Sequence, residues 1–166
     1  MDNPESIVTA EQAFERMARL CSQKECCTLD VRRKLRRMQI PEETVACIIT
    51  RLKKERYIDE ARYTRSYIHD KLSINKWGKK KIVLSLQQKQ IPATVIEDAF
   101  SVFSDTSLNA SLLPLLEAKR KTVKGQSAYE KNGKLIRYAL GRGFSMKEIL
   151  ACMQKMNLNE LPDETE

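Results

Sequence analysis

The sequence has very few of the residues on which catalytic and metal sites depend. Its single histidine, His69, lies between Ile68 and Asp70, and no motif of a nucleophile paired with a base accompanies it. The phosphate-binding pattern GxxxxGK[ST] is missing, so the chain has no P-loop with which to hold a nucleotide. Its five cysteines form no CxxC pair and no zinc-like spacing. We therefore predict a protein that is not an enzyme and has no catalytic residues, no metal and no cofactor.

Glycine, proline and aromatic residues are also scarce. Five Gly and five Pro in 166 residues favour helices over turn-rich sheets, and an aromatic content of 6% implies an aliphatic core. No long apolar run exists, so we expect no membrane span, and the N-terminus lacks the basic-then-apolar pattern of a signal peptide. Cys47 and Cys152 fall at apolar helical positions, where Cys acts as a small hydrophobe. We expect reduced thiols and a cytoplasmic location.

Positive charge dominates the middle of the chain. The net charge is +8, and neither residues 1–6 nor residues 158–166 contain a Lys or Arg. Residues 7–157 therefore carry all 30 basic residues against 16 acidic ones, which is a net charge of +14. Such a body indicates a polyanionic partner, most often nucleic acid. The alternative is a basic surface that serves only solubility.

Helix start signals punctuate the chain. Thr9 with Gln12 resembles a capping box, Thr28 can cap a second helix, and Pro41 suits the entrance of a third because its missing N–H is not needed there. Asp59 suits the N-cap of a fourth helix. In that helix Tyr63 and Tyr67 recur four residues apart on one face, and we expect both to lie in the core.

The apolar pattern then repeats at an offset of 51 residues. The first copy is Val31, Leu35, Ile40, Pro41, Val45, Ile49 and Leu52, and the second is Ile82, Leu86, Ile91, Pro92, Ile96, Phe100 and Phe103. A third copy follows at an offset of 53 as Phe144, Ile149, Met153 and Met156. Upstream of Phe144 the register is expected to slip by one residue, so that Leu140 rather than Ala139 corresponds to Leu86.

The third unit is expected to begin near Asp105. Its leucines suggest a helix, but Pro114 lies inside the pattern. Because proline is tolerated only in a first turn, the helix either starts near Ser111 or bends within 110–114. Two further capping boxes follow in this unit, and glycines suit the turn between its last two helices. These residues are Ser127 with Glu130, Ser145 with Glu148, and Gly141 with Gly143.

The predicted fold is all-α, with nine helices in three tandem three-helix repeats. The repeats span residues 9–56, 57–104 and 105–157, and residues 1–8 and 158–166 are expected to form flexible acidic tails. Each repeat is too small to bury much surface alone, so neighbouring repeats must pack against one another. This predicts an elongated, curved rod, and the pattern leaves open whether it turns to the right or to the left.

Three stretches resemble the bacterial RecX regulatory proteins. They are YIDEARYTRSY at 57–67, WGKKKIVLSLQQKQI at 77–91 and GRGFSMKEI at 141–149. The resemblance is strongest over residues 55–104. The positions that match the family's pattern are Asp59, Tyr63, Tyr67, Gly78, Ile82, Leu86, Lys89, Ile91, Arg142, Gly143 and Phe144. In three places the chain departs from the family: Arg56 and Gln90 replace frequent glycines at helix ends, and Thr64 replaces a usual Ala.

The resemblance implies a modulator of the RecA recombinase. Such a protein binds the RecA–DNA nucleoprotein filament, lies along its helical groove, inhibits ATP hydrolysis and strand exchange, and limits filament growth. The implied partners are RecA and single- or double-stranded DNA, with no membrane, and we expect a monomer. Two other functions stay open on the residues alone. One is a free-standing helix-turn-helix-like DNA-binding protein, and the other is a helical interaction scaffold without nucleic acid.

Three basic clusters are the candidate contacts to DNA or to the filament. They contain Arg32, Arg33, Arg36 and Arg37; Lys79, Lys80 and Lys81; and Lys119, Arg120, Lys121 and Lys124. The alternative for each cluster is a solubilising face. No aromatic residues alternate with these cations as a base-stacking platform would require, so base-specific recognition is not indicated. Trp77, the sole tryptophan, either packs locally across a turn or anchors a partner.

Overall fold

The structure, a computed structural model, describes residues 7–158, and that part of the chain is helical without strands. The all-α prediction is thus confirmed. No helix within these residues is long and apolar enough to cross a membrane. The helices are α1 (Ala10–Gln23), α2 (Thr28–Arg37), α3 (Glu42–Lys54), α4 (Glu60–Ser73), α5 (Lys79–Gln88), α6 (Ala93–Phe100), α7 (Asp105–Leu108), α8 (Leu112–Arg120), α9 (Ala128–Gly141) and α10 (Met146–Lys155).

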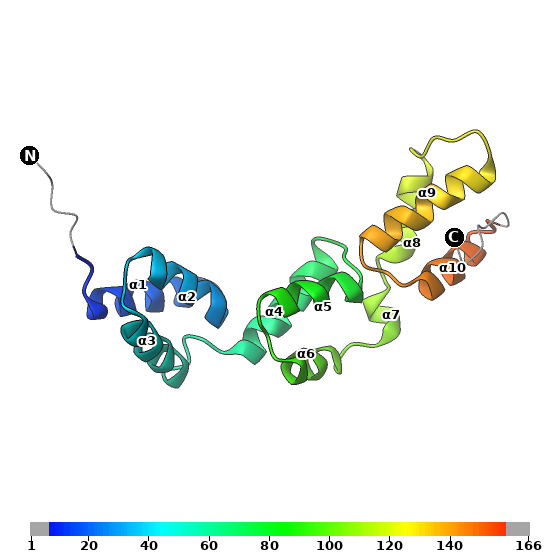
Figure 1. Cartoon of the computed structure of the whole chain (residues 1–166). Helices are drawn as coiled ribbons and strands as arrows, with labels where there is room; N and C mark the ends of the chain where they lie inside the picture. Colours follow the sequence, from blue (N-terminus) through cyan, green and yellow to red (C-terminus); the bar gives the residue numbers. More distant parts are fainter. Residues whose placement is uncertain (1–6, 159–166) are drawn as a thin grey trace, which may run out of the picture.

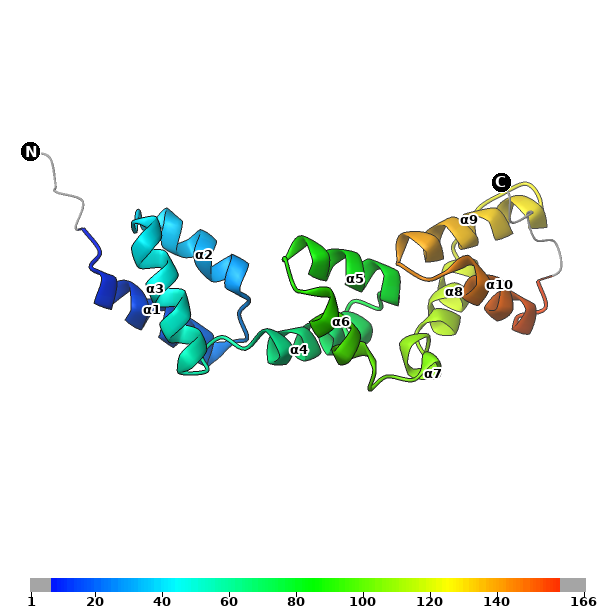
Figure 2. The ribbon, with the colours of Figure 1, turned by 60° about the horizontal axis from the view of Figure 1, so that its bottom comes forward.

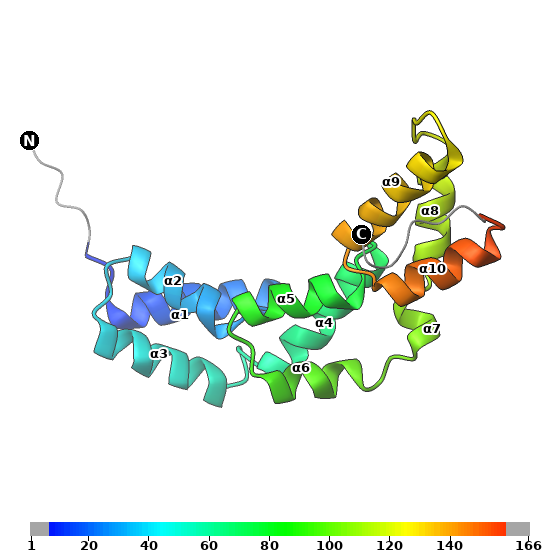
Figure 3. The ribbon, with the colours of Figure 1, turned by 45° about the vertical axis from the view of Figure 1, so that its right-hand side comes forward.

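The helices form three groups in a row. Figure 1 shows α1–α3 at one end of the molecule, α4–α6 in the middle and α7–α10 at the other end. We name these groups the first, second and third repeat. The body is elongated, and it bends where the third repeat meets the second, as Figure 3 shows. The prediction of tandem three-helix repeats in an elongated, curved body is confirmed, whereas the residue boundaries given for the repeats stay predictions.

Local capping sets several helix starts. The Thr9 side chain accepts a hydrogen bond from Gln12 N at 3.1 Å, and the Gln12 side chain accepts one from Thr9 N, so this capping box is complete. Ser145 and Glu148 form the same reciprocal pair at the start of α10. Two backbone N–H groups that a helix end leaves free are satisfied in each case.

Two other predicted caps differ from expectation. Ser127 accepts a hydrogen bond from Glu130 N, but the Glu130 carboxylate accepts from Gln126 N, one residue before the cap. Thr28 is not the cap of α2, and that prediction was wrong. Cys27 holds the N-cap position, but its side chain caps no backbone N–H group of α2, and Glu60 of the next repeat accepts from Thr28 N at 2.8 Å. The acceptor for Thr28 N lies 32 residues further along the chain, so the sequence around α2 does not reveal it.

The first helix of the third repeat is broken in two. The short helix α7 ends at Leu108, and α8 begins at Leu112 with Ser111 at its N-cap. Pro114 is the third residue of α8 and therefore lies in the first turn, where its missing N–H has no intrahelical partner to lose. Of the two alternatives for Pro114, a start near Ser111 is the one observed. Because of this break, residues 7–158 contain ten helices instead of the nine predicted.

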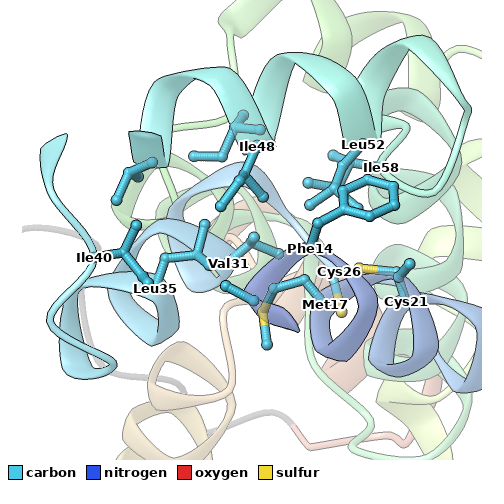
Figure 4. Packing of buried hydrophobic residues seen from close by; sticks show 14 residues of the cluster. Phe14, Met17, Cys21, Cys26, Val31, Leu35, Ile40, Ile48, Leu52 and Ile58 are labelled. Carbon is cyan, nitrogen blue, oxygen red and sulfur yellow. The ribbon is translucent and has the colours of Figure 1, made fainter. Parts of the chain in front are cut away.

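Three apolar clusters form the core, one centred in each repeat. In the first, Phe14, Val31, Leu35, Ile48 and Leu52 fill the space between α1, α2 and α3, as Figure 4 shows. The second and third clusters are built in the same way from aliphatic residues and a few aromatic rings. Each holds fully buried side chains, which indicates that every repeat has a core of its own.

The clusters also reach across the repeat boundaries. Cys27 and Leu29, at the start of α2, belong to the second cluster, as does Leu108 of α7. Neighbouring repeats therefore share apolar contacts, as expected for units too small to fold alone. Cys152 is buried in the third cluster, but Cys47 is exposed on α3, so its expected role as a small core hydrophobe was wrong.

Most residues of the two predicted acidic tails lie outside the described part of the chain. At its edges the structure describes Ile7, Val8 and Leu158. Ile7 is exposed, whereas Val8 packs against the first cluster and Leu158 packs against the third. The packed segments thus reach slightly further at both ends than the predicted limits.

The same turn closes the middle helix of every repeat. Ile40 N donates to Leu35 O at 3.3 Å, Ile91 N to Leu86 O at 3.1 Å, and Phe144 N to Ala139 O at 3.3 Å. These equivalent bonds make Ala139, not Leu140, the counterpart of Leu86. Ala139 is buried, and Leu140 is 41% exposed. The expected one-residue slip was wrong, and the offset of 53 continues without interruption.

A left-handed residue ends each of these helices. Gln39 and Gln90 both have φ of 59°, and their counterpart Gly143 has φ of 97°. Such a residue lets the following N–H groups bond back to the last helical carbonyls, and glycine adopts this conformation most easily. Arg56, after α3, also has positive φ, at 61°. The two positions where the chain lacks a frequent family glycine, Arg56 and Gln90, therefore adopt the conformation for which glycine is favoured.

The three middle helices follow one another head to tail. Figure 2 shows α2, α5 and α9 along one edge of the molecule. The end of α9 meets the start of α5 through Gly143 and Gly78, and the end of α5 meets the start of α2 through Lys89 and Asp30. We call this arrangement the helix row. Its two joints differ in chemistry.

The joint between α9 and α5 is a direct backbone contact, which we name the glycine joint. Gly78 N donates to Arg142 O at 2.7 Å, and Lys80 N donates to Gly143 O at 3.1 Å. A Cβ atom added to Gly78 would lie 2.5 Å from Gly143 C, and one added to Gly143 would lie 2.4 Å from the Cβ of Lys81. Both positions therefore require glycine. The free N–H groups at the start of α5 find their acceptors in Arg142 and Gly143, the two residues that follow α9.

The joint between α5 and α2, which we name the polar joint, uses side chains. Lys89 Nζ donates to both carboxylate oxygens of Asp30, at 2.9 and 3.1 Å. Arg62 Nε donates to Glu25 Oε1 at 2.6 Å. Glu60 Oε1 accepts from the Thr28 hydroxyl at 2.9 Å as well as from its backbone N–H. No backbone hydrogen bond joins these two helix ends in the described structure.

The glycine joint predicts a matched pair of glycine substitutions. In Gly78→Ala the new methyl group overlaps the backbone of Gly143 although the φ of Gly78, −82°, suits alanine. We expect a loss of roughly 1–3 kcal/mol, as for an overpacked contact, and an opening of the angle between the second and third repeats. Thermal unfolding and small-angle X-ray scattering measure the two effects.

Gly141→Ala is the control, because Gly141 has no atom within 4 Å of an added Cβ. It removes a glycine from the last turn of α9, and we expect it to leave stability unchanged or to raise it by up to about 1 kcal/mol. Equal melting temperatures and equal scattering curves for Gly78→Ala and Gly141→Ala would contradict the close contact.

The polar joint predicts an acid-sensitive stability. Burial alone raises the pKa of Asp30, but the hydrogen bonds from Lys89 and Cys27 outweigh burial and lower it. A carboxyl with a lowered pKa in the folded state stabilises the protein above its unfolded pKa, which is about 3.9. That stabilisation disappears as the pH falls through the folded-state pKa. Urea unfolding between pH 6 and pH 2 is expected to show a shallower loss of stability for Asp30→Asn than for wild type.

Asp98→Asn serves as the control for this pH series, since Asp98 is exposed on α6 and forms none of the ion pairs of the described chain. The stability of Asp98→Asn is expected to fall between pH 6 and pH 2 as steeply as that of wild type. If the stability of Asp30→Asn also falls as steeply as that of wild type, Asp30 contributes nothing to the acid dependence.

Candidate nucleic-acid interface

The structure does not gather the three predicted basic clusters into one patch. The arginines 32–37 lie on α2 of the first repeat, and Lys79–Lys81 form the first turn of α5 beside the glycine joint. The cations 119–124 lie at the end of α8 and in the loop that follows it. The clusters are thus distributed along the length of the molecule, with one in each repeat.

In the α2 cluster, only some of the cations are free. Arg36 Nε lies 2.7 Å from Glu42 Oε1, so Arg36 is already in an ion pair. Arg32 is half-buried, whereas Arg33 and Arg37 are exposed and have no ion-pair partner among residues 7–158. Arg33 and Arg37 are therefore the members of this cluster best placed to meet an external anion.

In the α5 cluster, two of the three lysines pack against aromatic rings. The Lys81 ammonium lies 4.6 Å from the ring centre of Trp77, and Lys79 lies 5.1 Å from that of Phe100. Lys81 Nζ is also 3.4 Å from Gly141 O. Lys80 has no comparable side-chain contact within the described residues. Lys81 thus faces the carbonyl end of α9, which offsets the repulsion from the positive end of its own helix.

The third cluster is mostly exposed. Lys119 lies 5.0 Å from the ring centre of Tyr138 and thus packs on α9. Arg120, Lys121 and Lys124 are exposed, and their side chains form no ion pair in the part of the chain that the structure describes. These three cations are free for an external contact.

Trp77 is held between two cations. It is half-buried against the second cluster. The ammonium groups of Lys71 and Lys81 each lie 4.6 Å from its ring centre, within the range of cation–π attraction. Trp77 N also donates to Lys71 O at 2.9 Å. These contacts account for Trp77 as a local packing residue, and the anchoring of a partner by Trp77 stays a prediction.

The residues that carry the resemblance build the core and the joints. Asp59 Oδ1 accepts from Arg62 N at 3.0 Å and caps α4. Tyr63 is buried, and the Tyr67 hydroxyl forms a hydrogen bond with Ser85 Oγ. Ile82, Leu86, Ile91 and Phe144 are all buried, and Gly78 and Gly143 form the glycine joint.

Several cations outside the three predicted basic clusters take part in these arrangements. Arg142 Nη1 donates to Asn75 O at 2.8 Å and so ties the third repeat to the second. Lys71 flanks Trp77, and Arg62 and Lys89 reach acidic residues of the first repeat. Arg142, Arg62 and Lys89 reach their partners only when one repeat docks on another, so local spacing does not reveal these contacts.

Hollows on the surface hold no clear arrangement of reacting groups. A hollow of about 480 Å³ beside α4, α7 and α8 is lined mainly by apolar residues such as Leu72, Phe103 and Leu115. His69 lies at its edge and is exposed, with Nδ1 3.5 Å from Asp70 Oδ1. Within residues 7–158 no three potential metal ligands come together.

The fold and the helix row define the class of protein: an all-helical chain of three tandem repeats, joined end to end through their middle helices. Comparison with known proteins gives the family. The family model for RecX, second three-helix domain, matches residues 59–99. A regulatory protein RecX from Clostridium acetobutylicum is 34% identical over 128 residues, and one from Streptococcus gordonii is 27% identical over 137 residues.

Solved structures agree with these sequence matches. The crystal structure of RecX from Lactobacillus salivarius superposes with a TM-score of 0.78 at 25% identity and covers 90% of this chain and 97% of that one. A second crystal structure of a regulatory protein RecX has a TM-score of 0.81 at 23% identity, over 87% of this chain and 73% of that one. The chain belongs to the RecX family of regulatory proteins.

The chain matches only part of the two RecX proteins named above. The match covers 82% of this chain but 52% of the Streptococcus gordonii protein, and 72% of this chain but 57% of the Clostridium acetobutylicum protein. The chain thus spans little more than half the length of these relatives.

Proposed function

We propose that this protein is a non-enzymatic regulator that binds the RecA–DNA nucleoprotein filament and inhibits its ATPase and recombinase activities. It acts as a monomer in the cytoplasm and needs no cofactor. Its partners are the RecA filament and the single- or double-stranded DNA within it. The observation that carries the proposal is the arrangement of three repeats in one elongated body, with exposed cations in each repeat.

The elongated shape and the distributed positive charge of the protein support a filament as its partner. A filament of protein on DNA repeats its charges along its length, and an elongated body can meet several of them at once. Free cations occur in each repeat, at Arg33 and Arg37, at Lys80, and at Lys121 and Lys124. Contacts of this kind favour affinity without base recognition, because phosphate contacts position a protein but carry little sequence information.

A titration of the cognate recombinase tests the proposal. The ATPase activity of RecA on single-stranded DNA is measured at increasing concentrations of this protein, and we expect it to fall. Gel shifts then compare naked duplex with recombinase-coated single strands. Strong sequence-specific binding to naked duplex, with unchanged ATPase activity, would favour the free-standing DNA-binding protein. Absence of binding to either substrate would favour the interaction scaffold.

The free position of Lys80 predicts a selective effect of charge reversal. Reversal of Lys79, Lys80 and Lys81 together would also disturb the Phe100 and Trp77 contacts, so Lys80→Glu alone is the sharper change. We expect weaker inhibition of the recombinase ATPase with an unchanged melting temperature. If Lys80 meets a phosphate, the log–log salt slope of binding falls by roughly 0.7–0.9.

Lys147→Glu is the matched control, because Lys147 is exposed on α10 and has no ion-pair partner in residues 7–158. It makes the same change in net charge at a site outside the predicted clusters. Equal inhibition curves for Lys80→Glu and Lys147→Glu, at low and at physiological salt, would remove Lys80 from the interface.

A further inference from the structure

A small polar hollow lies at the corner between α1 and α2 in the first repeat. Its volume is about 200 Å³, which admits a phosphate group but no helix or strand of a partner. Four cations line it, and none of them forms an ion pair within the described residues. They are Lys24, Arg33, Lys34 and Arg37.

The two carboxylates that also line this hollow are already engaged by the second repeat. Glu25 Oε1 accepts from Arg62 Nε at 2.6 Å, and its other oxygen is buried without a hydrogen-bond partner in the described chain. Asp30 receives two hydrogen bonds from Lys89 Nζ. Arg62 and Lys89 thus take the ion pairs of both acids, so none of the four lining cations is in an ion pair with them, although the charge of Arg33 contributes to the lowered pKa of Asp30.

The Cys26 thiol lies in the wall of the hollow, close to two of its lysines. The hydrogen bond with Cys21 is the largest cause that lowers the pKa of Cys26, to about 7. Burial opposes this shift, the nearby charges of Lys24 and Lys34 add to it, and the charge of Asp30 opposes it. The two lysines thus favour the thiolate, but they contribute less than the hydrogen bond.

The cations have the geometry of an oxyanion site. Arg33 and Arg37 are four residues apart on α2 and therefore lie on one face of the helix. Their guanidinium forks can each place two N–H donors on a tetrahedral phosphate, while Lys24 and Lys34 supply point charges from either side. The predicted cluster shared only Arg33 and Arg37 with this set, since Arg36 is paired with Glu42 and Arg32 lines a different hollow.

We propose that this hollow binds a phosphodiester group of nucleic acid, and that the polar joint controls its affinity. The proposal rests on the proposed function and places one DNA contact in the first repeat. When the second repeat is docked, Arg62 and Lys89 hold Glu25 and Asp30, and the hollow attracts an anion. When the joint opens, the two carboxylates become free to take the cations of the hollow instead, and the anion loses its site. Bound nucleic acid and a closed joint therefore stabilise each other.

Nucleic acid fits better than an acidic protein surface. The hollow is too small for more than one anionic group, so one contact alone gives little affinity, and a series of further anions must reach the exposed cations of the other two repeats. A sugar–phosphate backbone offers such a series, and the free cations of all three repeats can follow it. An acidic polypeptide is the alternative that the experiment must separate.

The first test removes the two arginines of the hollow. Binding of a fluorescently labelled single-stranded oligonucleotide is measured by anisotropy from 50 to 300 mM salt, a range set by the steep salt dependence of phosphate contacts. For Arg33→Gln with Arg37→Gln we expect the log–log salt slope to fall by about 0.7, which corresponds to the loss of the one phosphate that the hollow binds on a single strand. The same charge change in Arg16→Gln with Arg19→Gln, on exposed positions of α1, is expected to leave the slope close to that of wild type.

The second test asks whether the polar joint controls the affinity of the hollow for nucleic acid. Lys89 does not line the hollow, yet Lys89→Gln leaves Asp30 without its partner, and we expect weaker oligonucleotide binding. The double variant Lys89→Gln with Asp30→Asn has the same net charge as wild type and no free carboxylate at this position, so binding is expected to recover. A purely structural role of Lys89 would not be rescued by Asp30→Asn, and that result would overturn the proposed coupling.

The outcomes separate this proposal from the proposed function. If wild type inhibits the recombinase while the Arg33 and Arg37 variant keeps its salt slope, the hollow is not a phosphate site although the regulator role stands. If that variant loses oligonucleotide affinity while wild type leaves the recombinase ATPase unchanged, the phosphate site stands and the regulator role fails. Competition by poly-glutamate as strong as by an oligonucleotide of equal charge would overturn the choice of nucleic acid.

Discussion

The contact of Gly78 with the Arg142–Gly143 segment determines how the second and third repeats of this protein are held. Two helices meet there end to end, and the free N–H groups of one bond to the last carbonyls of the other. That arrangement needs the two backbones to approach more closely than any side chain permits. It fixes the direction of α5 relative to α9, and with it the bend seen in Figure 3.

The two joints of the helix row solve the same problem in different ways. At the polar joint, Cys27 and Gln90 occupy the positions of Gly78 and Gly143, and both carry a Cβ atom. The helix ends therefore stay apart, and ion pairs and a carboxylate cap bridge them. Backbone hydrogen bonds keep their partners at any ordinary pH and salt, whereas ion pairs at a half-exposed surface weaken as salt rises. The molecule thus combines one joint that is insensitive to its ionic surroundings with one that is sensitive to them.

Much of this fold could be predicted from the sequence, because apolar spacing and capping residues are local. The offset of 51 residues located the equivalent turns of the first two repeats, and those turns have matching hydrogen bonds. The third repeat was misread at one point, since the pattern favoured a large side chain at Leu140 while the buried position holds the small Ala139. A small side chain is enough to fill the space at Ala139, and a pattern based on large apolar side chains does not include alanine. The cap of α2 was misread for another reason, since its acceptor comes from α4.

The candidate interface could be predicted less well than the fold. Composition identified the basic clusters, but it could not show that Arg36 is paired, that Lys79 and Lys81 lie on aromatic rings, or that Arg62 and Lys89 face acids of another repeat. Whether a cation is available depends on its neighbours in space, and in a repeat protein many of these neighbours belong to the next unit.

The unequal joints also limit how such a chain can grow. An extra copy of the second repeat inserted after itself would present Gln90 to Gly78, and the glutamine side chain would stand where Gly143 has only hydrogen. Tandem duplication of this unit would therefore not reproduce the backbone joint, and each added unit would first need a new glycine at its helix end. The three repeats therefore cannot be exchanged or multiplied without changing the residues at their joints.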